Sequence, residues 1–202
     1  MSRAARPAID LSALPDHACG PASLGWWGVL GFILIEGMGF VLLAGSYFYL
    51  VPFEQRWPPA SPPPDLLWGT IFTIVAIASE WPNAMAARAA KAGNREMARS
   101  MLLVMVALGL LLVGIRFAEF AHLNVGWEDN AYGSILWATI VVHAFHLITD
   151  LYDSAVLAAI AHVKGLDGRR LSDVDDNTMY WHFIVWSWVA LYVLLYWVPR
   201  WR

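Results

Sequence analysis

Five long apolar stretches, separated by short polar segments, constrain this chain more than any other feature of its sequence. A helix needs roughly 20 apolar residues to cross about 30 Å of hydrocarbon, and each stretch reaches that length. The sequence therefore predicts an all-α integral membrane protein built as a bundle of five transmembrane helices. The predicted spans cover residues 25–50, 66–90, 98–122, 132–163 and 178–201.

The composition agrees with a membrane-embedded chain and excludes several other classes. Of the 202 residues, 59% are hydrophobic and only 14% are charged, which is too little charge to cover a soluble domain of this size. The net charge of −3 excludes a basic nucleic-acid binder, so no nucleic-acid partner is expected. Cys19 is the only cysteine, which excludes an internal disulfide and a paired-cysteine metal or redox motif.

The distribution of Lys and Arg predicts the orientation, because such residues accumulate on the cytoplasmic side. One side carries Arg3, Arg6, Arg88, Lys91, Arg95, Arg99, Lys164, Arg169 and Arg170, and the other carries Arg56, Arg200 and Arg202. This bias places the N-terminus in the cytoplasm and the C-terminus outside, in the periplasm of a bacterium. Residues 1–24 show no signal peptide and are predicted to form a cytoplasmic tail, and 25–202 a single membrane domain.

The segment HAFHLITDLYD in the fourth span places His143, His146, Asp150 and Asp153 on one helix face. Two imidazoles and two carboxylates in a row fit a metal site, a proton path or polar contacts within a bundle. Both groups are competent ligands for zinc, iron or manganese. The spacing, however, reproduces neither the paired Glu-x-x-His helices of di-iron bundles nor the HExxH of zincins. Polar contact between helices is the favoured interpretation.

Other ionisable residues also lie inside the spans, where a charge costs roughly 2.5–3.5 kcal/mol on insertion scales. Arg116 and Glu119 are three residues apart, so a local ion pair is predicted. Glu36 stands between glycines in GFILIEGMGF without a charged neighbour in its own helix. A structural hydrogen bond and a proton-handling role fit it equally. Glu80 and Asp153 are expected to be solvated or interfacial.

The last span contains YWHFIVWSWVALYVLLYW, in which Trp181, His182, Phe183, Trp188 and Tyr196 stand at fixed places. Here the chain resembles subunit III of the haem–copper oxidases, in its five-helix form. That family has a similar final helix, approximately W/F-H-F-x-D-x-x-W. Further matches follow in the family's order, one group per element: Phe32, Ile33 and Glu36; Trp57, Pro58 and Pro59; Leu108, Gly109, Glu119 and Phe120; Tyr132, Gly133, Ser134, His143 and His146.

The chain departs from the family pattern at several of these places. Val185 stands where the family usually has Asp, and Arg116 where it usually has Gln. Ile35 replaces the usual Ser, and Ala144 the usual Gly. Small or apolar residues are commoner at the positions of Asp150 and Asp153. These changes indicate a divergent branch, which leaves a nitric oxide reductase or another oxidase relative open as the partner complex.

The resemblance implies an accessory, non-redox subunit of a respiratory complex in a bacterial inner membrane. Such a subunit supports assembly, lipid binding and proton-linked turnover for cytochrome c or quinol oxidation. It binds no cofactor itself apart from structural phospholipid, since haem and copper lie in the catalytic subunit I, with subunit II as a further partner. The implied intramembrane polar network comprises Glu36, Glu119, His143, His146, Asp150 and His182.

Within this network, a bond between Glu36 and His143 or His146 is the first expected contact. The resemblance does not explain Asp150. The rival hypotheses are a stand-alone membrane metal protein using His143, His146, Asp150 and Glu36, and an ion-coupled transporter, which would usually show paired inverted halves.

Overall fold

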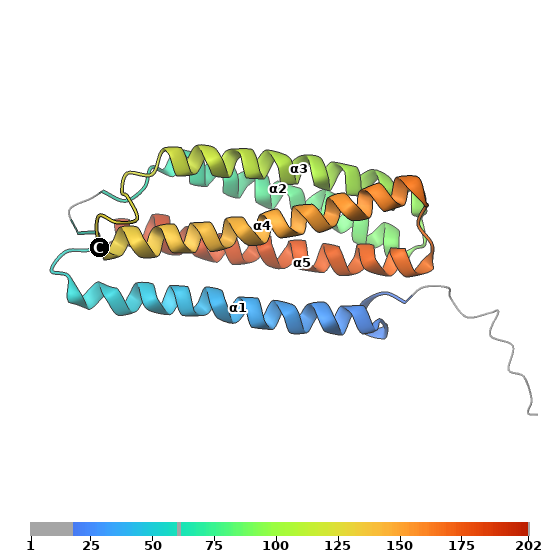
Figure 1. Cartoon of the computed structure of the whole chain (residues 1–202), viewed down its shortest axis with the longest axis horizontal. Coiled ribbons are helices and arrows are strands. Elements are labelled where there is room, and N and C mark those ends of the chain that lie inside the picture. Colours follow the sequence, from blue (N-terminus) through green and yellow to red (C-terminus); the bar gives the residue numbers. More distant parts are fainter. Residues whose placement is uncertain (1–17, 60–61, 202) are drawn as a thin grey trace, which may run out of the picture.

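The computed structural model describes residues 18–59 and 62–201, which form five long helices lying side by side (Figure 1). They are α1 (Leu24–Leu50), α2 (Leu66–Lys91), α3 (Arg95–Ala121), α4 (Ala131–Val163) and α5 (Gly168–Tyr192). The short elements are η1 (Gly20–Ala22), η2 (Val51–Phe53), the π-turn η3 (Val193–Trp197) and η4 (Val198–Arg200). Within these ranges there is no strand, so the all-α architecture is confirmed. The predicted tail 1–24 lies mostly outside the described residues.

Local sequence fixes where the helices begin. Ser23, Asn94, Asn130 and Asp167 each precede a helix, and each side chain accepts a hydrogen bond from a backbone N–H of the first turn. These are the residue types that favour the N-cap position, because their side-chain oxygens satisfy N–H groups that lack a partner within the helix. The caps therefore mark the starts of α1, α3, α4 and α5 independently of the apolar pattern.

Four of the helices are long and apolar enough to cross a membrane within the described part of the chain. They are α1 with η2, α3, α4, and α5 with η3 and η4. The helix α2 has the length, at 26 residues, but it is not among the four. It packs between α3 and α5, and its buried face is rich in small and polar side chains such as Ser79 and Asn83.

The fifth helix begins at Gly168, well before the predicted span at Thr178. The sequence suggests a loop for the polar stretch GRRLSDVDDN, because this stretch interrupts the apolar pattern. Asp167 caps it, while Leu171 and Val174 are buried in a small apolar cluster with alanines of α2, α3 and α4. Packing on one face is thus enough to continue the helix beyond the apolar span.

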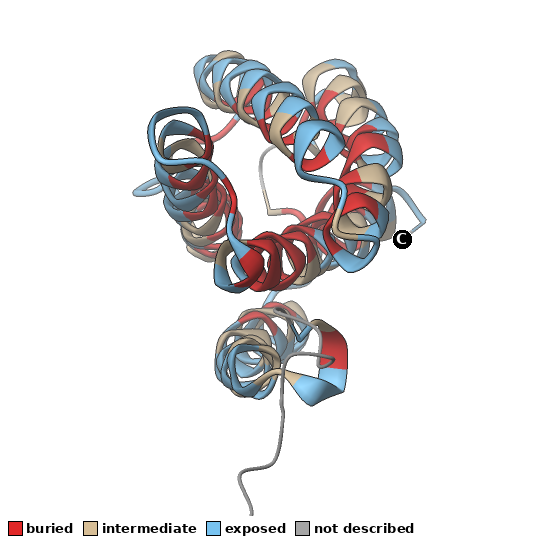
Figure 2. Cartoon of the chain, turned by 90° about the vertical axis from the view of Figure 1, so that its right-hand side faces the viewer, coloured by how far each residue is buried: buried red, intermediate tan, exposed pale blue. Residues whose placement is uncertain are grey.

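The helices α2, α3, α4 and α5 surround a common core, and α1 lies outside this group against α4 and α5 (Figure 2). Only Phe40 and Tyr47 of α1 are buried, and many of its large apolar side chains are exposed. A helix that is apolar on all sides is typical of a buried or membrane environment. The outward face of α1 therefore faces lipid or another protein.

The centre of the core is aromatic and closely packed. The most buried large side chains include Trp181, Trp188 and Tyr196. Gly69 on α2 lies so close to the Tyr196 ring that an added Cβ would stand 2.6 Å from Tyr196 Cζ. A larger residue would not fit at this position, because the Tyr196 ring crosses α2 here to reach the side chains of α3.

Candidate functional site

A buried ion pair lies on α3, facing η3. Arg116 Nη1 donates to Glu119 Oε2 at 2.6 Å, and both residues are 2% exposed. The Tyr196 hydroxyl donates to the other carboxylate oxygen of Glu119. Each charge of the pair therefore has an opposite charge and a hydrogen-bond partner beside it, which burial away from water requires.

Two aromatic rings enclose the guanidinium of Arg116. Its Cζ atom lies 3.8 Å from the ring centroid of Phe72 on α2 and 3.8 Å from that of Trp188 on α5. The negative faces of such rings attract a cation, more strongly when water is excluded. Trp188 Nε1 donates to Thr73 Oγ1 at 2.9 Å, which fixes one of the rings. This enclosure explains how a buried arginine is accommodated in an apolar helix.

His143 on α4 joins the ion pair and is fully buried. Its Nδ1 lies 3.2 Å from Arg116 Nη2, and its Nε2 lies 3.1 Å from the carbonyl oxygen of Ile184. A guanidinium can only donate and a carbonyl can only accept, so Nδ1 is unprotonated and Nε2 carries the hydrogen. His143 is therefore a neutral imidazole with both nitrogens engaged, and neither nitrogen is free to bind a metal.

Glu36 connects α1 to the rest of the bundle. The Tyr180 hydroxyl on α5 donates to Glu36 Oε2 at 2.5 Å, and His146 Nε2 on α4 lies 3.4 Å from Glu36 Oε1. Both the carboxyl and the imidazole are largely shielded from solvent. Of the two expected partners, the structure thus places His146, and not His143, next to Glu36.

The contact between Glu36 and His146 involves one proton. His146 Nδ1 donates to the carbonyl oxygen of Val142 at 2.6 Å, so Nε2 carries a hydrogen only when the ring is charged. Either an imidazolium donates to a carboxylate, or a protonated carboxyl donates to a neutral imidazole.

An aromatic ring separates these two polar clusters. Phe40 of α1 lies between the histidines, with its ring centroid 6.0 Å from that of His143 and 5.1 Å from that of His146. Among the described residues, no hydrogen bond joins the Arg116 cluster to the Glu36 cluster. The polar residues of the fourth span thus belong to separate groups and do not form one continuous row.

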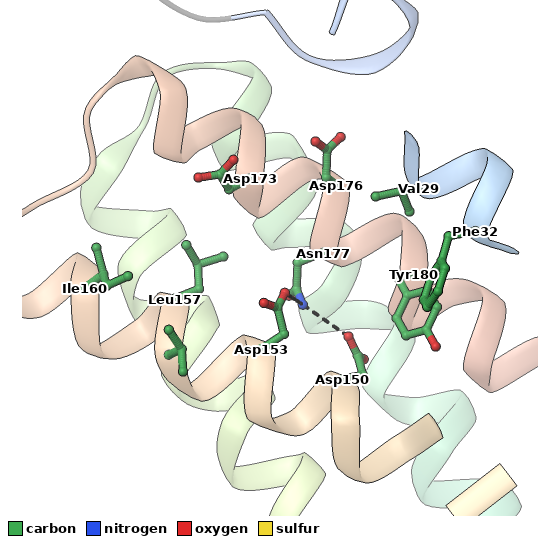
Figure 3. Close-up of a pocket in the computed structure, with 11 residues that line it drawn as sticks. Val29, Phe32, Asp150, Asp153, Leu157, Ile160, Asp173, Asp176, Asn177 and Tyr180 are labelled. Atoms are coloured by element: carbon green, nitrogen blue, oxygen red, sulfur yellow. Dashed lines mark hydrogen bonds between the residues drawn. The ribbon is translucent and has the colours of Figure 1, made fainter. Parts of the chain in front are cut away.

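Asp150 and Asp153 form a third group with α5. The amide nitrogen of Asn177 lies 3.2 Å from Asp150 Oδ1 (Figure 3) and 3.3 Å from Asp153 Oδ2. Ser154 donates to the Asn177 oxygen. The side-chain amide of Asn177 therefore donates hydrogen bonds to two carboxyl groups. No hydrogen bond among the described residues connects Asp150 to Glu36.

His182 lies away from the interior residues. Its side chain is 61% exposed, and its Nδ1 lies 2.8 Å from Glu80 Oε2 on α2. The family resemblance implies a place for His182 in the interior network, but its position on α5 turns it outward, so it forms a peripheral pair. Glu80 is partly buried beside it.

The structure also bears on the metal hypothesis and on Val185. Within the described residues, no three His, Cys, Asp or Glu side chains are grouped so that they could hold a metal ion. Val185 is buried in the apolar core next to Ile184, whose carbonyl binds His143. Where the family usually has an acid, this chain has an apolar contact.

Several residues that complete these clusters are not among the site residues predicted from the sequence. Tyr180, Tyr196, Asn177 and Trp188 all lie on the last helix or its π-turn and provide donors or a ring face. The aromatic bodies of the two tyrosines and Trp188 fit the pattern of a buried span, so periodicity does not distinguish them from packing residues, and Asn177 lies in the polar stretch expected to be a loop. The only available signal is the need for donors to satisfy acids buried on other helices.

Comparisons with known proteins agree with this architecture. A family model described as cytochrome c oxidase subunit III matches residues 20–200. A cytochrome c oxidase subunit 3 of Thermostichus vulcanus is 25% identical over 186 residues, which cover 92% of each chain. The protein of the same name from Marchantia polymorpha is 25% identical and covers 95% of this chain and 76% of its own. That of Arabidopsis thaliana is 26% identical with the same coverage.

Proposed function

Because this chain belongs to the cytochrome c oxidase subunit III family, we propose that it packs against catalytic subunit I of a haem–copper oxidase, with subunit II as a further partner. The family makes it an accessory subunit of such a complex. The match over residues 20–200 carries this conclusion. The unpartnered apolar face of α1 supports the proposal, because that face needs a cover of lipid or protein.

In the proposed topology all five helices cross a bacterial inner membrane, with the N-terminus in the cytoplasm. The 26 residues of α2 correspond to about 39 Å of helix at 1.5 Å per residue, enough to span the hydrocarbon. Its polar residues are turned toward neighbouring helices, since Ser79 accepts from Trp181 and Asn83 donates to the Thr178 carbonyl. This packing accounts for the lower hydropathy of α2 without removing it from the membrane.

Structural phospholipid is part of the proposal. An apolar groove between α1 and α5 is lined by Gly37, Phe40, Ala44, Phe183, Ala190 and Leu194, among others, and has a volume of about 460 Å³. Its surface offers almost no hydrogen-bonding groups, which suits an acyl chain. At Gly37, which carries no side chain, the Phe183 ring lies 3.6 Å from the position of an added Cβ, so α1 and α5 pack closely along this wall of the groove.

The Glu36–His146 pair supports a role in proton-linked turnover. It lies at the contact of α1 with α4 and α5 and can hold a proton on either residue. In the Arg116–Glu119–His143 cluster, by contrast, Arg116 Nη1 and Nη2, both Glu119 oxygens and both His143 nitrogens are engaged by hydrogen bonds. We assign the first cluster to proton handling and the second to holding the bundle together.

Purification under mild detergent from the native membrane tests the function. The proposal predicts that the chain co-migrates with a larger subunit that carries haem and copper, and mass spectrometry of that subunit identifies it. A nitric oxide reductase subunit in that place would favour the alternative that the divergent positions leave open. A stable monomer free of haem-bearing partners would contradict the proposal.

A further inference from the structure

An acidic cavity of about 430 Å³ lies between α1, α4 and α5, and its lining includes Tyr180, the donor to Glu36 (Figure 3). Four carboxyl groups line it, those of Asp150, Asp153, Asp173 and Asp176. None of these residues is among those that carry the family resemblance. The cavity is therefore a feature of this chain that its accessory role does not explain.

Two of these carboxyl groups have an oxygen without a partner. Asp150 is 2% exposed, and its Oδ1 accepts from Asn177 while its Oδ2 has no hydrogen-bond donor among the described residues. Asp176 is 9% exposed, and its Oδ1 likewise has no donor there. A buried acceptor without a donor is costly and rare in folded proteins. These oxygens indicate that a donor occupies the cavity.

The lining of the cavity supplies no positive charge. Within the described part of the chain, neither Lys nor Arg is among the lining residues. The nearby Lys91 pairs with Asp175, and Arg170 pairs with Asp167. Arg169 and Arg170 also lie near the exposed Asp173, but neither arginine lines the cavity beside Asp150. Asp150 and Asp176 are buried, whereas Asp153 and Asp173 are exposed to solvent. Two buried carboxyl groups without a cation in the described lining favour a bound cation.

The arrangement of the lining residues favours an organic cation over a metal ion. The carboxyl groups are spread along the cavity, and no three acids or histidines among the described residues come together around one metal position. The rest of the lining is apolar and aromatic, with the rings of Phe32 and Tyr180 at a centroid distance of 5.7 Å. Carboxylates facing an aromatic wall suit an organic ammonium group, which ring faces also attract.

We propose that this cavity binds a primary ammonium group, carried by an aminophospholipid headgroup or by a free amine. A primary ammonium has three N–H donors, enough to reach Asp150 Oδ2 and its neighbours. A quaternary ammonium has none, so it would leave the same oxygens without a partner. The apolar wall formed by Val29, Phe32, Val156 and Ile160 can cover the carbon chain attached to the amine. The inference rests on these contacts and not on the identity of the partner subunits.

The test uses the intact complex in nanodiscs with a choline lipid, to which a trace of an ethanolamine lipid with the same acyl chains is added. Retention of each lipid on this chain is measured by native mass spectrometry. The wild-type complex is expected to retain the ethanolamine lipid in preference to the choline lipid. Spermidine added to choline nanodiscs forms a second arm, in which binding of the free amine identifies the soluble source.

Variants connect the retention to the cavity. Asp150→Asn should lower retention of the ammonium ligand by about tenfold or more, because a charge-assisted hydrogen bond becomes a neutral one. Asp153→Asn should act in the same direction and provides the test if Asp150→Asn fails to assemble. Glu128→Gln, in the exposed loop before α4, should retain the ligand as the wild type does.

Three outcomes would overturn the proposal. One is equal retention of the ethanolamine and choline lipids by the wild type, with no binding of spermidine. Another is retention by Asp150→Asn or Asp153→Asn at the wild-type level. The third is loss of retention in Glu128→Gln to the same extent as in the cavity variants, which would show a general effect of surface charge. If the chain is not an accessory subunit, it is placed alone in the same nanodiscs and the same lipid selectivity is expected, so the two proposals fail separately.

Discussion

Replacing Arg116 with methionine is expected to destabilise the bundle by about 3–5 kcal/mol, the usual cost of removing one partner from a buried ion pair. At the 2.6 Å separation of Arg116 Nη1 and Glu119 Oε2, the Coulomb attraction is about 6 kcal/mol for an effective dielectric constant of about 20. Desolvation of both charges offsets part of that attraction. The substitution also removes the guanidinium from between the rings of Phe72 and Trp188 and takes away the donor to His143 Nδ1.

A double-mutant cycle separates the ion pair from these other losses. Arg116→Met leaves Glu119 buried without a counter-charge, and Glu119→Gln leaves Arg116 in the same condition. The double variant removes both charges at once, so its loss should be smaller than the sum of the single losses by about 2 kcal/mol or more. The assay is the free energy of unfolding of the purified chain in mixed micelles with increasing sodium dodecyl sulfate.

Additive losses in that cycle would refute the reasoning. They would mean that the two charges do not depend on each other, despite the short distance between them. A second readout is the tautomer of His143, measured by nitrogen NMR of labelled histidine. The wild type should show a hydrogen on Nε2 and a bare Nδ1, and Arg116→Met should allow the other tautomer to appear.

Three further predictions concern the same interior. Glu36→Gln should leave the complex assembled, since the amide can keep both contacts of the carboxyl. Oxygen turnover should fall only modestly, by much less than the roughly 10²-fold loss that removal of a catalytic acid or base causes. An unassembled complex would show that Glu36 has a structural role. His143→Leu should cost about 1–3 kcal/mol in the free energy of unfolding, because a buried donor and a carbonyl lose their partner, and unchanged stability would contradict this. Gly69→Ala should cost about 1–3 kcal/mol through its clash with Tyr196, whereas Gly114→Ala, which has open space around it, should cost nothing measurable.

Helix positions could be predicted from the sequence wherever an apolar run and a cap coincide. Residues 131–163 form one helix because Asn130 caps it and the apolar pattern continues to its end. The start of α5 could not be found in this way. Its first turns are polar, and they are helical because Leu171 and Val174 are buried against other helices, a contact that only the tertiary structure shows.

The sequence predicted which residues belong to the site better than it predicted which of them contact one another. Helical spacing placed Arg116 and Glu119 together, since an ion pair three residues apart depends on one helix alone. Glu36 contacts His146 and not His143 because of the way α1 is rotated about its axis relative to α4. In the same way, the rotation of α5 about its axis places His182 on the outside. Helical periodicity does not set rotations between helices when every face of a helix is apolar.

The central claim is that these buried acids and imidazoles satisfy one another while the redox chemistry takes place in a partner subunit. Native mass spectrometry of the intact complex, followed by gas-phase release of this chain, tests it most directly. The account predicts that the released chain carries lipid and no iron or copper, and that haem and copper stay with the larger subunit. Stoichiometric transition metal on the released chain would contradict it.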